Sequence, residues 1–144
     1  MSQRMNYDAV SPGGIRALGA VHEYVRQSGL PSRLVDLVFL RVSQINRCAY
    51  CIGLHSRDLV KIGMPAEHVG LVAAWPEADG IFDAQERAAL AWAEVVTRLG
   101  EGGVPDSAFQ AMAAVFGEKH RADLTIAIGL MNAYNRMAIC AHGG

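Results

Sequence analysis

Apolar residues recur at intervals of three and four along most of this chain, which is the spacing that places side chains on one face of an α-helix. In the stretch 32–45, for example, Leu34, Leu37, Val38 and Val42 are in phase. No segment alternates regularly between apolar and polar residues, as a half-buried β-strand would. The pattern therefore predicts an all-α fold, a compact bundle of several helices.

Proline, glycine and capping residues indicate where these helices begin and end. Asp83 and Glu86, for instance, have the spacing of a capping box at the start of a helix that continues to Leu99. The dipeptide Trp75-Pro76 is expected to open a loop. The predicted helices cover residues 12–25, 32–45, 48–63, 65–74, 83–99, 105–116 and 119–140.

The last predicted helix is apolar on most sides through its middle, which suits a bundle core or a subunit interface. Because the sequence contains no internal repeat and no interdomain linker, we expect residues 1–144 to form a single domain. Hydrophobic residues make up 51% of the chain and charged residues 19%, a composition that excludes a disordered protein.

Charge and hydropathy narrow the choice of partners. Thirteen basic and fourteen acidic side chains give a net charge of −1, so no broad basic surface is available for nucleic acid. In the C-terminal third, the longest run free of strongly polar residues is 124–131, far shorter than a bilayer span. The first residues lack the apolar stretch of a secretory signal. We expect a soluble, cytoplasmic protein that binds neither nucleic acid nor a membrane.

The cysteines are the feature of the sequence that indicates a chemically active site. There are three, Cys48, Cys51 and Cys140, and an odd number with two only three residues apart is not typical of a disulfide scaffold. In a reducing compartment such a pair is typical of a redox-active or a metal-binding site. Cys140 falls in the last predicted helix, where we expect a core or interface residue.

Cys48 and Cys51 would both lie in the first turn of a helix, where free N–H groups and the helix dipole stabilise thiolates. His55 follows on the same face and could exchange protons with a sulfur. Closing a disulfide there requires some distortion, because Cβ atoms three residues apart on a helix are roughly 5–6 Å apart. A relaxed disulfide has them about 3.5–4.5 Å apart, so we expect a labile, accessible disulfide. The dipole favours Cys48 as the attacking thiol, whereas proximity to His55 favours Cys51.

Two other interpretations of the pair stay open. Free cysteines are often buried, so both could be structural thiols. Cys48, Cys51 and His55 could also bind zinc with a fourth ligand from Asp36, Cys140 or water, although three ligands on one helix lack the usual second ligand-bearing segment. The other histidines have no partner at ligand spacing, and we interpret them as surface or hydrogen-bonded core residues: His22, His68, His120 and His142.

The run CAYC followed by three residues and histidine, preceded by LRVSQIN, resembles the core motif of the AhpD-like alkylhydroperoxidases, within the carboxymuconolactone decarboxylase superfamily. The stretches FDAQERAALAWAEVVTRL and MNAYNRMAI resemble downstream helices of that group, so the resemblance extends over most of residues 7–140. It implies an all-helical homo-oligomer, a trimer or a hexamer. It also implies a peroxidase that reduces organic hydroperoxides with no organic cofactor and no metal.

Carried over by position, the resemblance makes Cys51 the peroxidatic thiol, Cys48 the resolving thiol and His55 a proton-relay histidine. Asp36 falls where the family has a relay glutamate and is one methylene shorter. Tyr50 stands where the best-characterised branch has a histidine, and it either hydrogen-bonds to the thiols or packs with its hydroxyl at the surface. Ser43 belongs to the motif's flank and either touches the pocket or serves helix packing.

The implied partner is a dithiol reductant protein, lipoyl-type or thioredoxin-like, that reduces the Cys48–Cys51 disulfide after each turnover. Two alternative functions accompany this one. The first is a decarboxylase acting on a carboxymuconolactone-like ring, as in another branch of the superfamily. The second is a non-catalytic redox sensor or assembly subunit that responds to oxidation of the pair.

Overall fold

The computed structural model describes residues 3–142, and every regular element in that range is helical. The elements are α1 (Tyr7–Val10), α2 (Pro12–Gln27), α3 (Ser32–Asn46), α4 (Ala49–Lys61), α5 (Ala66–Gly70), the 3₁₀ helix η1 (Leu71–Glu77), α6 (Ala84–Thr97), α7 (Asp106–Ala113) and α8 (Glu118–Ala141). The predicted all-α class is confirmed. Among these residues, no helix has the length and hydropathy that crossing a membrane requires.

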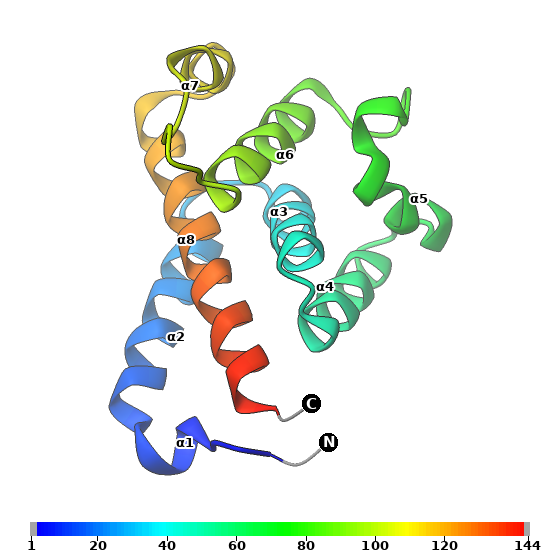
Figure 1. The fold of residues 1–144 in the computed structure, drawn as a ribbon. Coiled ribbons are helices and arrows are strands. Elements are labelled where there is room, and N and C mark those ends of the chain that lie inside the picture. Colours follow the sequence, from blue (N-terminus) through cyan, green and yellow to red (C-terminus); the bar gives the residue numbers. More distant parts are fainter. Residues whose placement is uncertain (1–2, 143–144) are drawn as a thin grey trace.

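Helix α3 is the centre of the fold and packs against α4, α6 and α8 (Figure 1). Ten consecutive residues, 34–43, are buried, so α3 is enclosed on all sides. The last helix was predicted to lie in a bundle core or at a subunit interface. In the single chain α8 buries one side and leaves Ile126 and Ile139 exposed, because neighbouring helices cover only part of it.

Two apolar clusters meet at α3. The larger lies among α2, α3, α6, α7 and α8 and includes Phe39, Trp92 and Ile128. The smaller lies among α3, α4, α5, η1 and α6 and includes Leu40 and Leu59. Because both clusters contain residues of α3, packing on two sides fixes the position of that helix.

Most predicted boundaries agree with the structure, and the capping box at the start of α6 is confirmed in both of its hydrogen bonds. The expected loop at Trp75-Pro76 is wrong, since both residues lie inside η1. Arg87 explains the difference. Its guanidinium donates to the carbonyl oxygens of Trp75 and Pro76, at 3.1 and 2.9 Å, and lies over the Trp75 ring. The contact of Arg87 with residues more than ten positions earlier in the chain thus stabilises the helical turn of η1 beyond Trp75.

The N-terminal segment runs back to the end of α8. Its short helix α1 was not predicted, and its N-cap is Asn6, whose side-chain oxygen accepts from the Ala9 N–H at 3.2 Å. The Arg4 N–H donates to the Ala141 carbonyl at 2.7 Å, beside a bridge between Gln3 and His142. The described ends of the chain therefore lie side by side below α2 and α8 (Figure 1).

Candidate active site

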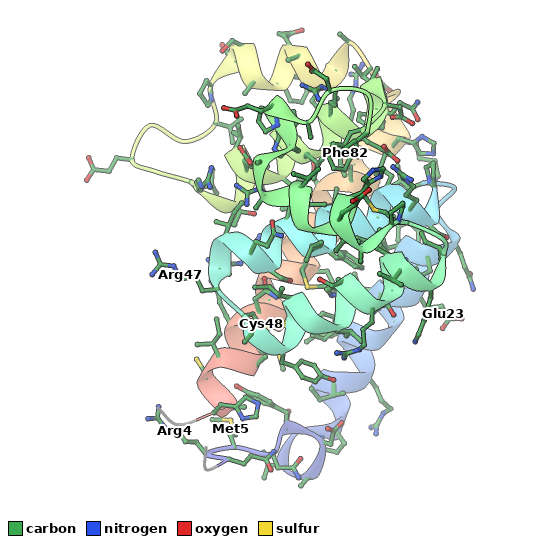
Figure 2. All side chains as sticks on the ribbon, turned by 90° about the vertical axis from the view of Figure 1, so that its right-hand side faces the viewer. Arg4, Met5, Glu23, Arg47, Cys48 and Phe82 are labelled. Carbon is green, nitrogen blue, oxygen red and sulfur yellow. A yellow bond between two sulfur atoms is a disulfide. The ribbon has the colours of Figure 1, made fainter. Side chains whose placement is uncertain are left out.

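The turn between α3 and α4 places Cys48. Arg47 has φ 60°, the only positive φ at a non-glycine residue in 3–142, and this left-handed residue ends α3. The Arg47 N–H donates to the Gln44 carbonyl at 3.2 Å, and the Cys48 N–H donates to the Ser43 carbonyl at 3.0 Å. Figure 2 shows Arg47 at the edge of the molecule with Cys48 beside it, at the start of α4. Cys48 is thereby fixed as the N-cap of α4.

Cys48 and Cys51 form a disulfide across the first turn of α4, with their Cα atoms 5.3 Å apart. Cys48 Sγ also accepts from the Cys51 N–H at 3.4 Å, as expected of sulfur at a helix start. The expected accessibility is wrong for the single chain, because Cys48 is 2% exposed and Cys51 is 5% exposed. Packing of α4 against α3 and α8 covers the pair, and Cys51 reaches the outside through a cavity.

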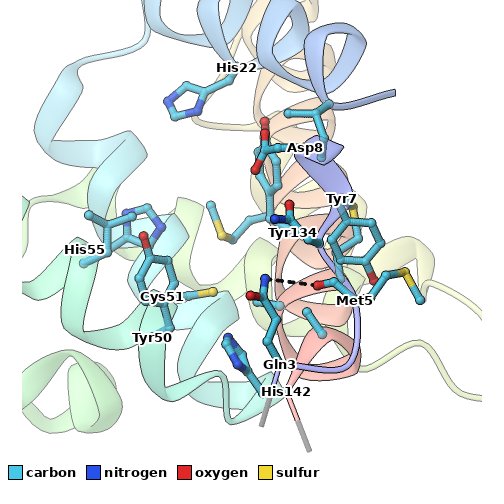
Figure 3. Close-up of a pocket in the computed structure, with 17 residues that line it drawn as sticks. Gln3, Met5, Tyr7, Asp8, His22, Tyr50, Cys51, His55, Tyr134 and His142 are labelled. Carbon is cyan, nitrogen blue, oxygen red and sulfur yellow. Dashed lines mark hydrogen bonds between the residues drawn. The ribbon is translucent and has the colours of Figure 1, made fainter. Parts of the chain in front are cut away.

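This cavity has a volume of about 500 Å³ and lies between α4 on one side and α8 with the N-terminal segment on the other (Figure 3). Cys51 and His55 line it from α4, and His22 lines it from α2. The remaining wall is mostly apolar and aromatic, with contributions from Met5, Tyr7, Ile15, Tyr50, Leu54, Met131, Tyr134 and Met137. Such a wall suits the organic part of a small molecule.

His55 is 3% exposed and packs on the Phe39 ring, with the ring centroids 5.2 Å apart. Burial is the main cause that lowers its pKa from 6.5 to about 4, and Asp58 opposes this effect while Arg26 and His22 add to it. The imidazole is therefore neutral at neutral pH. Its Nδ1 atom is buried without a hydrogen-bond partner among the described residues, and Asp58 Oδ2 lies 3.8 Å away.

Asp36 lies beside His55, where the sequence analysis expected a relay carboxylate. Its side-chain oxygen, one nitrogen of His55 and one oxygen of Asp58 all lie within 4.8 Å of one another. Asp36 is 3% exposed and accepts from Arg26 Nη2 at 2.6 Å. Burial raises the pKa of Asp36, and the hydrogen bond and charge of Arg26 oppose that rise. Arg26 Nε also donates to His22 Nε2 at 3.2 Å.

Three members of this cluster were not predicted from the sequence. Asp58 has a local signal, because it stands three residues after His55 on the same helix. Arg26 and His22 have none, because they reach His55 and Asp36 only through the packing of α2. His22 is half-buried and hydrogen-bonded and His142 is exposed, as predicted for core or surface histidines, and both also line the cavity.

The remaining predicted residues occupy different places. Tyr50 is 65% exposed and lines the cavity, and within the described chain no hydrogen bond joins it to a cysteine. Ser43 is fully buried inside α3, where its hydroxyl donates to the Phe39 carbonyl at 2.7 Å and accepts from Asn135 at 3.0 Å. It therefore serves the packing of α3 against α8. Cys140, expected in the core or an interface, is exposed in the single chain.

Two residue sets could be considered for a metal. In the disulfide form, the sulfurs of Cys48 and Cys51 are not thiolates and do not offer the ligands that zinc prefers. Asp36, His55 and Asp58 converge within 4.8 Å, but the Arg26 guanidinium already occupies Asp36 and would repel a cation. The arrangement fits thiol and proton-transfer chemistry better than metal binding.

Comparisons with known proteins give a family match and several similar proteins. Residues 12–95 match the carboxymuconolactone decarboxylase family. The uncharacterized protein YdfG of Bacillus subtilis is 32% identical over 139 residues, which cover 96% of this chain and 94% of that protein. A crystal structure from Agrobacterium tumefaciens superposes with a TM-score of 0.91 and 36% identity, over 99% of this chain and 97% of that one. It is a protein of unknown function, suggested to be the antioxidant defence protein AhpD.

Two more distant structures share the fold. The alkylhydroperoxidase AhpD core of an uncharacterized peroxidase-related protein from Ralstonia eutropha has a TM-score of 0.79 at 24% identity, over 95% of this chain and 74% of that one. The debrominase Bmp8 has a TM-score of 0.77 at 19% identity, over 92% of this chain and 72% of that one. At these identities the likeness supports the fold alone.

Proposed function

The chain belongs to the carboxymuconolactone decarboxylase family and is AhpD-like, and from this premise we propose that it is a thiol-dependent peroxidase that reduces organic hydroperoxides. One observation carries the proposal. Cys51, one half of a disulfide at a helix N-terminus, and His55, a buried neutral imidazole, line the same largely apolar cavity. A hydroperoxide with an apolar organic group would find its site and both reactive groups in one place.

The reaction begins with the reduced pair. The Cys51 thiolate attacks the distal oxygen of ROOH and the O–O bond breaks, so that sulfur loses two electrons and becomes a sulfenic acid. The alkoxide leaves as ROH after taking a proton. The Cys48 thiol then condenses with the sulfenic acid, which forms the disulfide and releases water. A dithiol partner, lipoyl-type or thioredoxin-like, reduces this disulfide and is itself oxidised to a disulfide.

Each residue has a defined part in this scheme. Cys51 takes the peroxidatic role because it is the cysteine that lines the cavity, and Cys48 resolves the sulfenic acid. His55 accepts the thiol proton and returns it to the alkoxide, because a neutral imidazole can do both. Asp36 stabilises the charged imidazolium from a buried position. Assembly into a trimer or hexamer is part of the same proposal.

The test is a single turnover without reductant. The reduced protein receives one equivalent of cumene hydroperoxide, free thiols are counted, and the disulfide is mapped by peptide mass. We expect two thiols to disappear as a Cys48–Cys51 bond while Cys140 stays free. Cys140→Ser is the matched control and should react like the wild type. The variant Cys48→Ser should stop at a sulfenic acid on Cys51 that dimedone traps, whereas Cys51→Ser should leave the peroxide unreacted.

Slow or absent oxidation, with both thiols still titratable, would contradict the proposal. The same variants separate the alternatives. A carboxymuconolactone decarboxylase-like enzyme would keep its activity after both cysteines become serine. A redox sensor would be oxidised once and change its assembly state, and it would not consume peroxide continuously when dithiothreitol is supplied.

A further inference from the structure

The buried Nδ1 atom of His55 has no hydrogen-bond partner among residues 3–142. Buried polar atoms are nearly always paired, and an unpaired one costs free energy. His55 also lines the cavity, and because Nδ1 is buried, Nε2 is the ring nitrogen left to face it. The group that binds Nδ1 therefore decides which tautomer His55 presents to Cys51.

Two carboxylates are near enough to be that group. Asp36 is held by Arg26, whose Nη2 atom lies 2.6 Å from its Oδ1 atom and offsets its charge. Asp58 Oδ2 lies 3.8 Å from Nδ1, about 1 Å beyond a hydrogen bond. The Asp58 side chain is 30% exposed, and its nearest cation, Lys61 Nζ, is 4.0 Å from Oδ1. A side-chain rotation of Asp58 would close the gap, whereas rotation of Asp36 is restricted by its short hydrogen bond to Arg26.

We propose that Asp58 is the positioning residue of His55: its carboxylate accepts a hydrogen bond from Nδ1–H and so leaves the Nε2 lone pair free to take the Cys51 thiol proton. The inference rests on the proposed peroxidase function and assigns the supporting carboxylate to a residue outside the family motif. In the step itself, the thiol proton moves to Nε2, Asp58 adds to Asp36 in balancing the imidazolium charge, and the same proton then passes to the alkoxide. Asp58 touches neither the sulfur nor the substrate.

The charged groups around His55 support this assignment. Helix α2 contributes Arg26 and His22, α3 contributes Asp36, and α4 itself contributes Asp58 with Lys61 beside it. Because the charge of Arg26 offsets much of the charge of Asp36, Asp58 supplies the larger share of the negative charge that balances an imidazolium.

The first test reads the tautomer directly and requires no activity. Nitrogen-15 NMR of histidine-labelled protein, with the reduced and the oxidised pair, should show His55 protonated at Nδ1. In Asp58→Ala the proton should move to Nε2, the tautomer that an imidazole without an Nδ1 acceptor prefers. Asp58→Glu should restore the Nδ1–H form. A wild-type His55 protonated at Nε2, or an Asp58→Ala spectrum unchanged from the wild type, would overturn the proposal.

The second test measures the single-turnover rate of Cys51 oxidation by cumene hydroperoxide against pH. We expect Asp58→Ala to be slower by about tenfold, part of the gain that positioned acid–base groups supply, and Asp58→Glu to recover most of the rate. The acid limb of the Asp58→Ala profile should move to lower pH, because Asp58 stabilises the protonated form of His55. Glu67→Gln is the matched control, since Glu67 lies 3.8 Å from His68 outside the site, and it should behave like the wild type.

An unchanged rate and profile in Asp58→Ala would also overturn the proposal, whatever the tautomer. Failure of the peroxidase proposal is distinguishable, because it would leave the wild-type cysteines unoxidised while the NMR experiment still reports on Asp58.

Discussion

Acid should destabilise this fold through His55. Burial is the main cause that lowers the pKa of His55 in the folded protein from 6.5 to about 4, whereas the unfolded chain keeps the ordinary value. Between these two pH values the unfolded state binds a proton that the folded state does not. The stabilisation that comes from keeping His55 neutral is therefore complete above pH 6.5 and is lost as the pH falls toward 4.

The size of the effect follows from the two pKa values. One pH unit of difference corresponds to about 1.4 kcal/mol, so the fall from 6.5 to about 4 corresponds to about 3 kcal/mol in full. Over the accessible range from pH 7 to pH 5, the expected loss is about 2 kcal/mol. Asp36 acts in the opposite direction, because its pKa is raised in the folded state, mainly by burial. A comparison of two proteins that both contain Asp36 removes most of its contribution.

The assay is urea unfolding followed by circular dichroism at pH 7, 6 and 5, with the protein concentration fixed so that any assembly contributes equally. The wild type is compared with His55→Gln, whose amide does not titrate. The free energy of unfolding of the wild type should fall by about 2 kcal/mol more than that of the variant. His68→Gln, a substitution outside the cavity, should keep the wild-type dependence. Parallel curves for the wild type and His55→Gln, within about 0.5 kcal/mol, would refute the reasoning.

Three further predictions concern the turn before Cys48, the buried packing of α3 and the proposed relay. Arg47→Gly should raise the free energy of unfolding by about 0.5–1 kcal/mol, seen as a higher urea midpoint, because glycine adopts the left-handed conformation without a steric cost; a lower midpoint would contradict this. Ser43→Ala should lower the free energy of unfolding by about 1–2 kcal/mol, because Asn135 loses its hydroxyl partner; an unchanged thermal midpoint would argue against it. Asp36→Asn should slow peroxide-dependent oxidation of Cys51 by about tenfold or more in stopped-flow measurements, and Asp36→Glu should alter the rate or its pH profile. Unchanged rates would remove Asp36 from the relay.

The sequence predicts the local parts of this molecule well. Helix boundaries depend on nearby residues, and the capping box at Asp83 holds in both of its bonds. The placement of Cys48, Cys51 and His55 on one helix could be predicted for the same reason, because spacings of three and four residues fix side chains on one face of a helix. These three residues are the part of the candidate site that one segment defines by itself.

The rest of the site depends on tertiary packing and could not be predicted from spacing. Arg26 and Asp36 stand on different helices, and only the arrangement of α2 beside α3 brings them to 2.6 Å. The walls of the cavity come from α2, α4, α8 and the N-terminal segment together. The burial of the disulfide also depends on tertiary packing. Helix periodicity indicates which residues share a face, but it does not indicate which segment covers that face.

The pairing of the two described chain ends has a practical consequence for work on this protein. Gln3 and His142 bridge to each other, and both line the cavity that contains Cys51. An affinity tag or a fluorescent fusion attached next to Gln3 or His142 would therefore begin at the rim of the proposed substrate site. A polyhistidine tag there would add metal-binding imidazoles close to a reactive thiol, so a cleavable tag, removed before any peroxide assay, is the appropriate choice for expression.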